Sequence, residues 1–423
     1  MRRKAGVNRI LSFGSAVALL VGVANSPVQA QANTPSRPQA TVALPPEFNR
    51  AAYNPAVLHL QFTPLPEGRT TASGGDAFLD ITLIPSSGKL EGVRVELTTA
   101  DFRNQLRNLY VQLSRQDSLK VDDPQSPSRQ LYALLFESLT TSLQREKITT
   151  LLIAADRGLQ AVPFAALSDG QRYFGDRYAF SITPSLALTD LGTSGDPGQR
   201  LLALGASEFE GLAALPLVPQ ELDRIGADAN KDLFLNQEFT PDRFLEKASE
   251  STYSQLHVAT HAEFKPGGPN ASQLHSGIGP ISMSELAKLR KERQGVPLDL
   301  VVFSACRTAL GDANAELGFS GLALQAGARS AVGTLWYVDD VVTSAYFVQM
   351  YRYLNQGIPK AEAMQLTRQG FARNLVRLDG DRLLGVNDQP LLLNLTPSQQ
   401  RRVSSGVNNP FFWAGIELMG SPW

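Results

Sequence analysis

Cysteine is almost absent from this 423-residue chain, which contains a single one, Cys306. A disulfide needs two cysteines, so no internal bridge can hold the fold, and a metal cluster built from several thiolates is excluded as well. A lone thiol is either a small buried apolar group or a free, reactive one. The sequence therefore raises the question of which of these Cys306 is.

The chain also has no large surplus of either charge. It carries 39 Lys and Arg residues against 40 Asp and Glu residues, for a formal net charge of −1. Proteins that bind nucleic acid in general show a basic surplus, so nucleic acid is not an expected partner. Hydrophobic residues make up 43% and charged residues 19% of the chain, which is the composition of a globular protein with a sizeable core.

Long apolar runs are confined to the N-terminus. Residues 1–9 carry four basic residues and no acidic one, and the apolar stretch ILSFGSAVALLVGVA follows. Small residues then offer cleavage sites near Ala30, so residues 1–30 are predicted to be an export signal, with an uncleaved membrane anchor as the alternative. Cleavage leaves 35 basic against 40 acidic residues, a charge of −5. We expect a periplasmic or extracellular protein, membrane-tethered only if the signal is retained.

Three segments follow the signal. Residues 31–56 are rich in proline, alanine and polar residues, which predicts a disordered tether. Residues 57–146 contain three strand patterns and two helical patterns, which predict a small β/α extension. Residues 147–423 alternate strand and helix patterns. This alternation predicts an α/β fold of three layers, a mostly parallel central sheet with helices on both faces.

Two of the expected strands end in residues suited to nucleophilic chemistry. QLHVATH ends in His261, and DLVVFSAC ends in Cys306. Ligands of parallel sheets bind beyond the carboxyl ends of the strands, so neighbouring strands would bring both side chains to one rim. A nearby imidazole makes a thiolate available near neutral pH, which predicts His261 as base and Cys306 as nucleophile. The backbone N–H groups of Ala262 and Cys306 are candidate donors to an oxyanion.

A structural role remains open for each residue taken singly, because a lone cysteine or histidine most often serves packing. The other histidines are weaker candidates for a base. His257 lies inside its strand and is expected in the core, His59 belongs to an N-terminal strand, and His275 belongs to a polar loop. The combination of His261 and Cys306, 45 residues apart and both at strand ends, favours catalysis.

The segments THAEF and FSACRTALG resemble the histidine and cysteine segments of the CHAT domain family, bacterial relatives of the caspases and separases. LLIAADRGLQAVPFAALSDG, GFSGLALQAGARSAVGTLWYVDD and NNPFFWAGIELMG resemble further segments, so the resemblance spans residues 57 to 420. It implies a bacterial family member of cyanobacterial type with a caspase-like fold. It also implies a cysteine peptidase that acts on a protein or peptide. His261 and Cys306 would form its dyad, although Ala262 stands where the family more often has glycine. A regulatory protein is a further implied partner, while no cofactor or metal is.

The resemblance also suggests a substrate pocket, lined after the first core strand and after the cysteine strand. Asp156 occupies the first place, while Asp339 and Asp340 lie after the later strand that ends at Trp336. An acid in the pocket would favour a basic substrate residue. A turn residue explains Asp156 equally well, and acids at a helix start explain the other two. Two other functions stay open: a non-cleaving interaction module, and acyl transfer or amide hydrolysis on a small molecule.

Overall fold

The computed structural model describes residues 54–116, 121–156, 158–183, 185–186, 189, 200–226, 230–263, 272–306, 318–337 and 339–423. The expected signal and nearly all of the expected tether lie outside these residues. The first strand already begins at Pro55, so the last two tether positions, Pro55 and Ala56, belong to the fold. Among the described residues, no helix is both long enough and apolar enough to span a bilayer.

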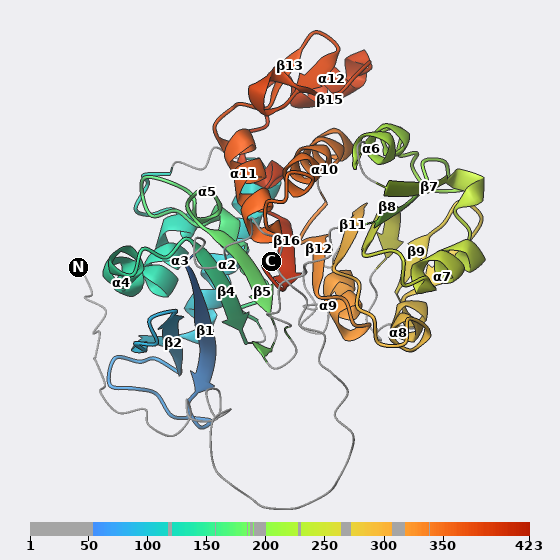
Figure 1. Cartoon of the computed structure of the whole chain (residues 1–423). Helices are drawn as coiled ribbons and strands as arrows, with labels where there is room; N and C mark the ends of the chain where they lie inside the picture. The colour runs from blue at the N-terminus through green and yellow to red at the C-terminus, as the bar shows by residue number, and fades with distance from the viewer. Residues whose placement is uncertain are drawn as a thin grey trace, which may run out of the picture.

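A 13-stranded sheet runs through the centre of the molecule (Figure 1). Most of its pairings are parallel, and it falls into two halves that meet at the pair β12–β16. One half contains β6 (Arg200–Gly205), β7 (Asn230–Leu235), β8 (Gln255–Glu263), β11 (Leu300–Cys306) and β12 (Ser330–Thr334), with the short β9 (Gln273–His275) and β10 (Pro280–Ser282). The other contains β1 (Pro55–Pro64), β2 (Ala77–Pro85), β3 (Glu91–Leu97), β4 (Thr150–Ala155), β5 (Ala179–Thr183) and β16 (Ile416–Gly420).

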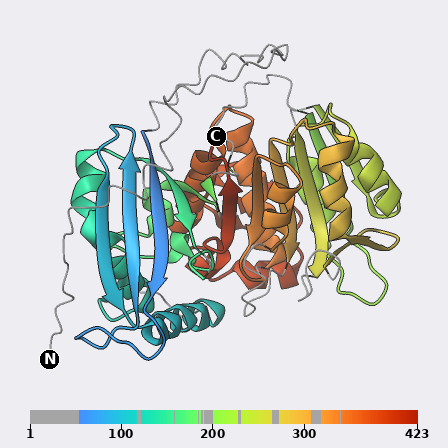
Figure 2. The same ribbon diagram turned by 90° about the horizontal axis from the view of Figure 1, so that it is seen from below.

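The two halves run in opposite directions. β6, β8, β11 and β12 are parallel to one another, and β16, β5, β4 and β1 are parallel to one another. β12 and β16 are antiparallel, so the carboxyl ends of the first group and of the second lie at opposite edges of the sheet. In Figure 2 the arrows of β8 (yellow) and β16 (red) point in opposite directions.

Helices cover both faces of the sheet. One face packs against a large core that includes α2 (Thr99–Ser114), α3 (Pro127–Phe136), α6 (Val218–Arg224), α10 (Asp340–Leu354) and α11 (Lys360–Ala372). The other face packs against α7 (Pro241–Ser249), α8 (Met283–Glu292) and α9 (Gly318–Gln325), which cover the half with β6, β8, β11 and β12. The predicted three-layer α/β fold with a mostly parallel sheet is therefore confirmed.

Local sequence signals account for several helix boundaries. Thr240 precedes Pro241, and its side chain accepts a hydrogen bond from the Arg243 N–H, which caps α7 as the Thr-Pro pair predicts. The second helical pattern of the N-terminal extension, at residues 130–144, does not form one helix. The chain there breaks into α3, a 3₁₀ turn and α4 (Thr140–Arg145). Phe136, with φ of −129°, leaves the helical conformation at that break.

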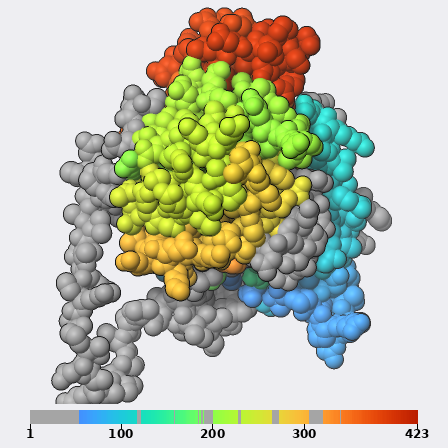
Figure 3. Space-filling model, turned by 90° about the vertical axis from the view of Figure 1, so that its right-hand side faces the viewer, coloured from blue at the N-terminus to red at the C-terminus, as the bar shows by residue number. Residues whose placement is uncertain are grey.

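A small subdomain lies between α11 and β16. It consists of the three-stranded sheet β13 (Arg377–Asp379), β14 (Arg382–Leu384) and β15 (Pro390–Leu392), followed by α12 (Pro397–Val403). It projects at the top of Figures 1 and 3 and rests on α6 and α10. Gln220 of α6 holds it by exchanging two hydrogen bonds with the backbone of Leu393. The sequence did not predict these strands, which are only three residues long.

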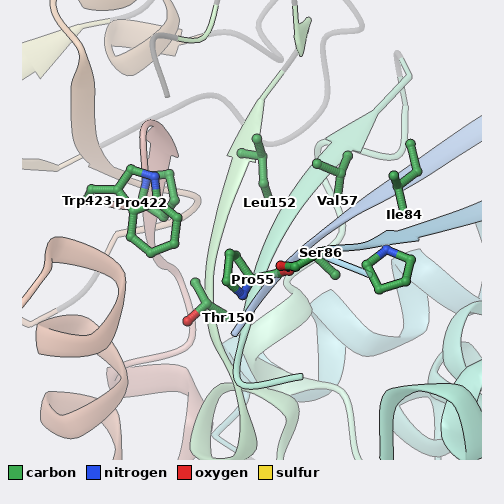
Figure 4. A pocket seen from close by; sticks show the side chains of 10 residues that line it. Pro55, Val57, Ile84, Ser86, Thr150, Leu152, Pro422 and Trp423 are labelled. Atoms are coloured by element: carbon green, nitrogen blue, oxygen red, sulfur yellow. The ribbon is translucent and has the colours of Figure 1, made fainter. Parts of the chain in front are cut away.

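An apolar pocket of about 160 Å³ lies on the half of the sheet with β1 and β4 (Figure 4). No ionisable side chain lines it, and it does not include His261 or Cys306. Its walls are formed by Pro55, Ala56, Val57, Ile84, Pro85, Ser86, Thr150, Leu152, Pro422 and Trp423. This pocket therefore offers no acid, base or nucleophile for chemistry.

Candidate functional site

The structure brings the backbones of His261 and Cys306 together. β8 and β11 pair in parallel from Gln255 opposite Leu300 up to His261 opposite Cys306. Residues opposite each other in neighbouring strands lie about 4.8 Å apart. Both residues stand at the carboxyl edge of this half of the sheet. The Cys306 side chain and residues 307–317 lie outside the described part of the chain.

The His261 ring is held by the loop of residues 206–217, which joins β6 to α6. Its Nε2 lies 2.7 Å from the carbonyl oxygen of Ala213, and the Phe209 ring lies 4.7 Å away, centre to centre. A carbonyl oxygen only accepts hydrogen bonds, so Nε2 carries a proton and donates it. In the neutral ring Nδ1 then holds the free lone pair, which is the atom a base requires. No sequence signal could have indicated this contact, because every residue has a carbonyl oxygen.

A second histidine, His257, lies in the same strand but has a structural environment. It is fully buried, and its Nε2 lies 2.9 Å from a carboxylate oxygen of Glu221 in α6. Ser344 of α10 donates to the other oxygen of Glu221 at 2.6 Å. This buried group ties β8 to α6 and α10. His257 is therefore a core residue, as its position inside the strand predicts.

Ala262, the predicted oxyanion donor, lies one residue beyond His261. It is 5% exposed and stands opposite Leu274 in the antiparallel pair that β8 forms with β9. Its backbone is therefore close to the rim that carries His261. The roles of the Ala262 and Cys306 N–H groups as oxyanion donors remain predictions.

Asp156 lies far from this rim. It follows β4, and four strands, β5, β16, β12 and β11, separate β4 from β8. Because β4 belongs to the oppositely directed half, Asp156 stands at the other edge of the sheet. Its carbonyl accepts a hydrogen bond from the Leu159 N–H at 3.0 Å, and Gly158 has φ of 90°, as in a tight turn. The assignment of Asp156 to a pocket beside His261 is thus wrong, and its turn role holds.

Asp339 and Asp340 follow β12 at the same edge as Cys306, but their charges are already engaged. Asp339 caps α10 by accepting from the Val341 N–H at 2.9 Å. Arg402 of α12 lies 2.8 Å from Asp339 and 2.6 Å from Asp340. Burial raises the pKa of Asp339, and the Arg402 guanidinium opposes that rise. The pair therefore fits the helix start and the docking of α12 better than a pocket for a basic side chain.

Two carboxylates lie on the loop that holds the His261 ring, next to Phe209. Glu208 and Glu210 are exposed on the loop after β6, the strand that borders β8 on the side away from β11. The loop of residues 206–217 contains no Lys or Arg. The sequence stretch SEFEG contained the signal, but using it required knowing that β6 and not β4 is the neighbour of β8.

Among the described residues, no group of three or more His, Cys, Asp or Glu side chains is arranged to hold a metal ion. Glu263 of β8 and His275 of β9 form a pair of two such groups, with a Glu263 carboxylate oxygen 3.8 Å from His275 Nε2. The described part of the site thus offers an imidazole, backbone groups and carboxylates for its chemistry.

Three solved structures resemble the chain at low sequence identity. The separase–securin complex of Saccharomyces cerevisiae has a TM-score of 0.49 and 10% identity, and the match covers 88% of this chain but 30% of that one. The Arg-specific cysteine proteinase gingipain R has a TM-score of 0.41 and 10% identity, with 76% and 75% covered. The complex of the Porphyromonas gingivalis RgpB pro- and mature domains has a TM-score of 0.38 and 11% identity, and the match covers 76% of this chain and 77% of that one. The chain therefore spans less than a third of the separase chain.

No curated protein matches the sequence. The CHAT domain family matches residues 125–421, which is well over half of the chain. The match begins in the segment that leads into α3, later than the expected start at residue 57, so β1 to β3 and α2 precede it. The match includes both His261 and Cys306. Because it covers well over half of the sequence, the chain belongs to the CHAT domain family.

Proposed function

We propose that the protein is an exported cysteine endopeptidase that cleaves a protein partner with a dyad of His261 and Cys306. One observation carries the proposal: Cys306 stands opposite His261 at the carboxyl edge of two parallel strands. The hydrogen bond from Nε2 to Ala213 supports it, because it leaves Nδ1 as the acceptor for a thiol proton. The predicted oxyanion donors and the expected export signal belong to the same proposal.

The chemistry follows from these roles. His261 Nδ1 accepts the proton of the Cys306 thiol, and the thiolate sulfur attacks the carbonyl carbon of a peptide bond. Backbone N–H groups at the rim stabilise the negative oxygen of the tetrahedral intermediate. The imidazolium returns its proton to the amine nitrogen as the C–N bond breaks, which leaves a thioester. Water, deprotonated by the same ring, hydrolyses the thioester and releases the acid and the free thiol.

Peptide-library profiling tests the proposal directly. The purified protein, lacking residues 1–30, is incubated with a peptide mixture at neutral pH, and the new termini are identified by mass spectrometry. We expect cuts that share a sequence preference and that are absent with the Cys306→Ser variant. If neither peptides nor unfolded proteins are cut, while folded proteins bind, the alternative of a non-cleaving interaction module is correct. Release of small amides alone would indicate a small-molecule hydrolase.

The preference should include a basic residue near the cut, because Glu208 and Glu210 make the loop beside His261 acidic. Each exposed pair of opposite charges contributes about 0.2–1 kcal/mol, so the double change Glu208→Gln with Glu210→Gln should lower kcat/KM for a basic peptide about 2- to 30-fold. For a neutral peptide kcat/KM should be unchanged. Glu67→Gln, an exposed change in the loop between β1 and β2, is the control. Equal effects on both peptides would contradict the charge argument.

A further inference from the structure

The position of the His261 ring depends on a loop with no regular structure of its own. Ala213 and Phe209, which contact the ring, both belong to the loop of residues 206–217. The loop is closed by a hydrogen bond from the Leu215 N–H to the Ser207 carbonyl at 2.9 Å. The position of the Ala213 carbonyl, and with it the orientation of the ring, therefore depends on how firmly Ser207 is held at the start of the loop.

Asn236 fixes Ser207. It follows β7, and its side-chain oxygen lies 2.7 Å from the Ser207 nitrogen and 3.2 Å from the Ser207 hydroxyl oxygen. Both groups of Ser207 therefore donate to one acceptor, and Ser207 is only 5% exposed. Because Ser207 is buried, leaving its two donors without an acceptor would be costly. The backbone of Asn236 is left-handed, with φ of 52°, a conformation that asparagine and glycine tolerate better than other residues.

A glycine of the β9–β10 hairpin holds Asn236 from the other side. The Gly277 N–H donates to the Phe239 carbonyl at 2.9 Å, and the Phe239 N–H donates to the Asn236 carbonyl at 2.9 Å. A Cβ added at Gly277 would lie 1.9 Å from the Asn236 carbonyl oxygen, far inside contact distance. The hairpin is tied back to β8 by a hydrogen bond from the Thr260 hydroxyl to the His275 carbonyl. Thr260 is the residue before His261. The contacts thus run from His261 through the loop, Asn236 and the hairpin back to the residue next to His261.

We propose that Asn236 is the positioning residue for His261. Its side chain fixes Ser207, Ser207 fixes the loop, and the loop presents the Ala213 carbonyl that keeps the proton on Nε2 and the lone pair on Nδ1. Gly277 is glycine because its neighbour Asn236 must approach so closely. The inference rests on the proposed function, since a misplaced base matters only if His261 acts on Cys306.

The test begins with Asn236→Gly, which removes the side chain but permits the left-handed backbone. We expect thiol alkylation at pH 6 to slow, but by less than in His261→Ala, because the ring is still present. We expect kcat/KM for peptide cleavage to fall about tenfold, a part of the 10²- to 10⁴-fold that general acid–base catalysis supplies. Asn236→Asp keeps the acceptor oxygen and should restore most of the rate. Asn374→Gly is the matched control, because Asn374 is exposed after α11 with φ of 57° and contacts neither loop.

A second pair of variants checks the ring of contacts without touching asparagine. Gly277→Ala must push the Asn236 carbonyl away and should reproduce the tenfold loss of kcat/KM expected for Asn236→Gly. Gly279→Ala lies two residues further along the same hairpin, where an added Cβ meets nothing within 4 Å, and should behave as wild type. The melting temperature of each variant shows whether it is folded.

A readout that does not depend on catalysis separates this inference from the proposed function. ¹⁵N-labelled histidine NMR reports which ring nitrogen of His261 carries the proton. In wild type and in the Asn374→Gly variant we expect the Nε2–H form, and in Asn236→Gly a mixture of both tautomers. An unchanged ring and an unchanged alkylation rate in Asn236→Gly would overturn the positioning role. If the tautomer shifts but His261→Ala leaves the wild-type alkylation rate unchanged, the positioning role stands and the peptidase proposal fails.

Discussion

Replacing His261 with alanine should slow alkylation of Cys306 at pH 6 about tenfold and slow peptide cleavage by about 10³-fold or more. An unassisted thiol ionises near pH 8.5, so at pH 6 only about 0.3% of it is thiolate. A base that raises this fraction to about half increases the thiolate population by more than a hundredfold. Part of that gain is lost because a less basic thiolate is also less nucleophilic. Cleavage loses more, because general acid–base catalysis typically supplies 10²- to 10⁴-fold.

The measurement is clean because Cys306 is the only thiol in the chain. Iodoacetamide labelling, followed by mass spectrometry between pH 5 and pH 9, gives the rate of that single residue. In His261→Ala the rate should fall tenfold per pH unit below pH 8.5, whereas in wild type it should fall off only at lower pH. His59→Ala, in the oppositely directed half of the sheet, is the control. If wild type and His261→Ala follow the same pH curve as a free cysteine, Cys306 is a packing residue.

Changing Glu417 to glutamine should make the stability of the protein less dependent on pH. Glu417 lies in β16 opposite Gly333 and is 5% exposed, and its Oε1 has no hydrogen-bond partner. Burial raises its pKa well above the ordinary value of 4.5, although the positive charge of Arg368 opposes this. Above pH 4.5 the unfolded chain therefore loses this proton while the folded chain keeps it. Folding must then take up a proton, so stability falls as pH rises, by at most about 1.4 kcal/mol per pH unit.

Urea unfolding at pH 5, 6, 7 and 8 measures this effect. The free energy of unfolding of Glu417→Gln minus that of wild type should grow with pH, until the pH passes the raised pKa of the folded protein. The slope is the test, because an amide buried without partners lowers the stability of the variant by an amount independent of pH. Glu67→Gln, an exposed change, should show a flat difference. A flat difference for Glu417→Gln would mean that the carboxyl group is solvated or ionised in the folded protein.

Most of the longer strands could be predicted from the sequence, but their directions could not. Strands such as β4 and β6 are apolar on both faces, and buried strands look alike whether their neighbour is parallel or antiparallel. The resemblance to CHAT domains suggests a pocket position for Asp156, and no pattern in the sequence contradicts that suggestion. β12 and β16, which are far apart in the sequence, pair antiparallel, and β4 lies beyond β16. The strand before Asp156 therefore belongs to the other half of the sheet. Very short strands, such as β9 and β13 to β15, carry too few residues for a pattern.

The two residues proposed for catalysis could be found from the sequence because their types are rare and both lie at or near the carboxyl end of a strand. Their support could not be found in this way. The Ala213 carbonyl is a group that every residue carries, and Phe209 and Asn236 belong to ordinary polar or aromatic stretches. These residues become important only because β6 and the β9–β10 hairpin lie beside β8, the strand that carries His261, and β7 lies beside β6.

The central place of β16 affects how the protein is made. This strand follows every other described strand in the sequence, yet it lies between β12 and β5, in the middle of the sheet. Ribosomes synthesise proteins from the N-terminus, so β12 and β5 have unpaired edges until the final strand emerges. Open edges of this kind invite pairing with other chains, and nascent domains that expose them depend on chaperones. The two halves of the sheet can thus join only when translation has passed residue 420.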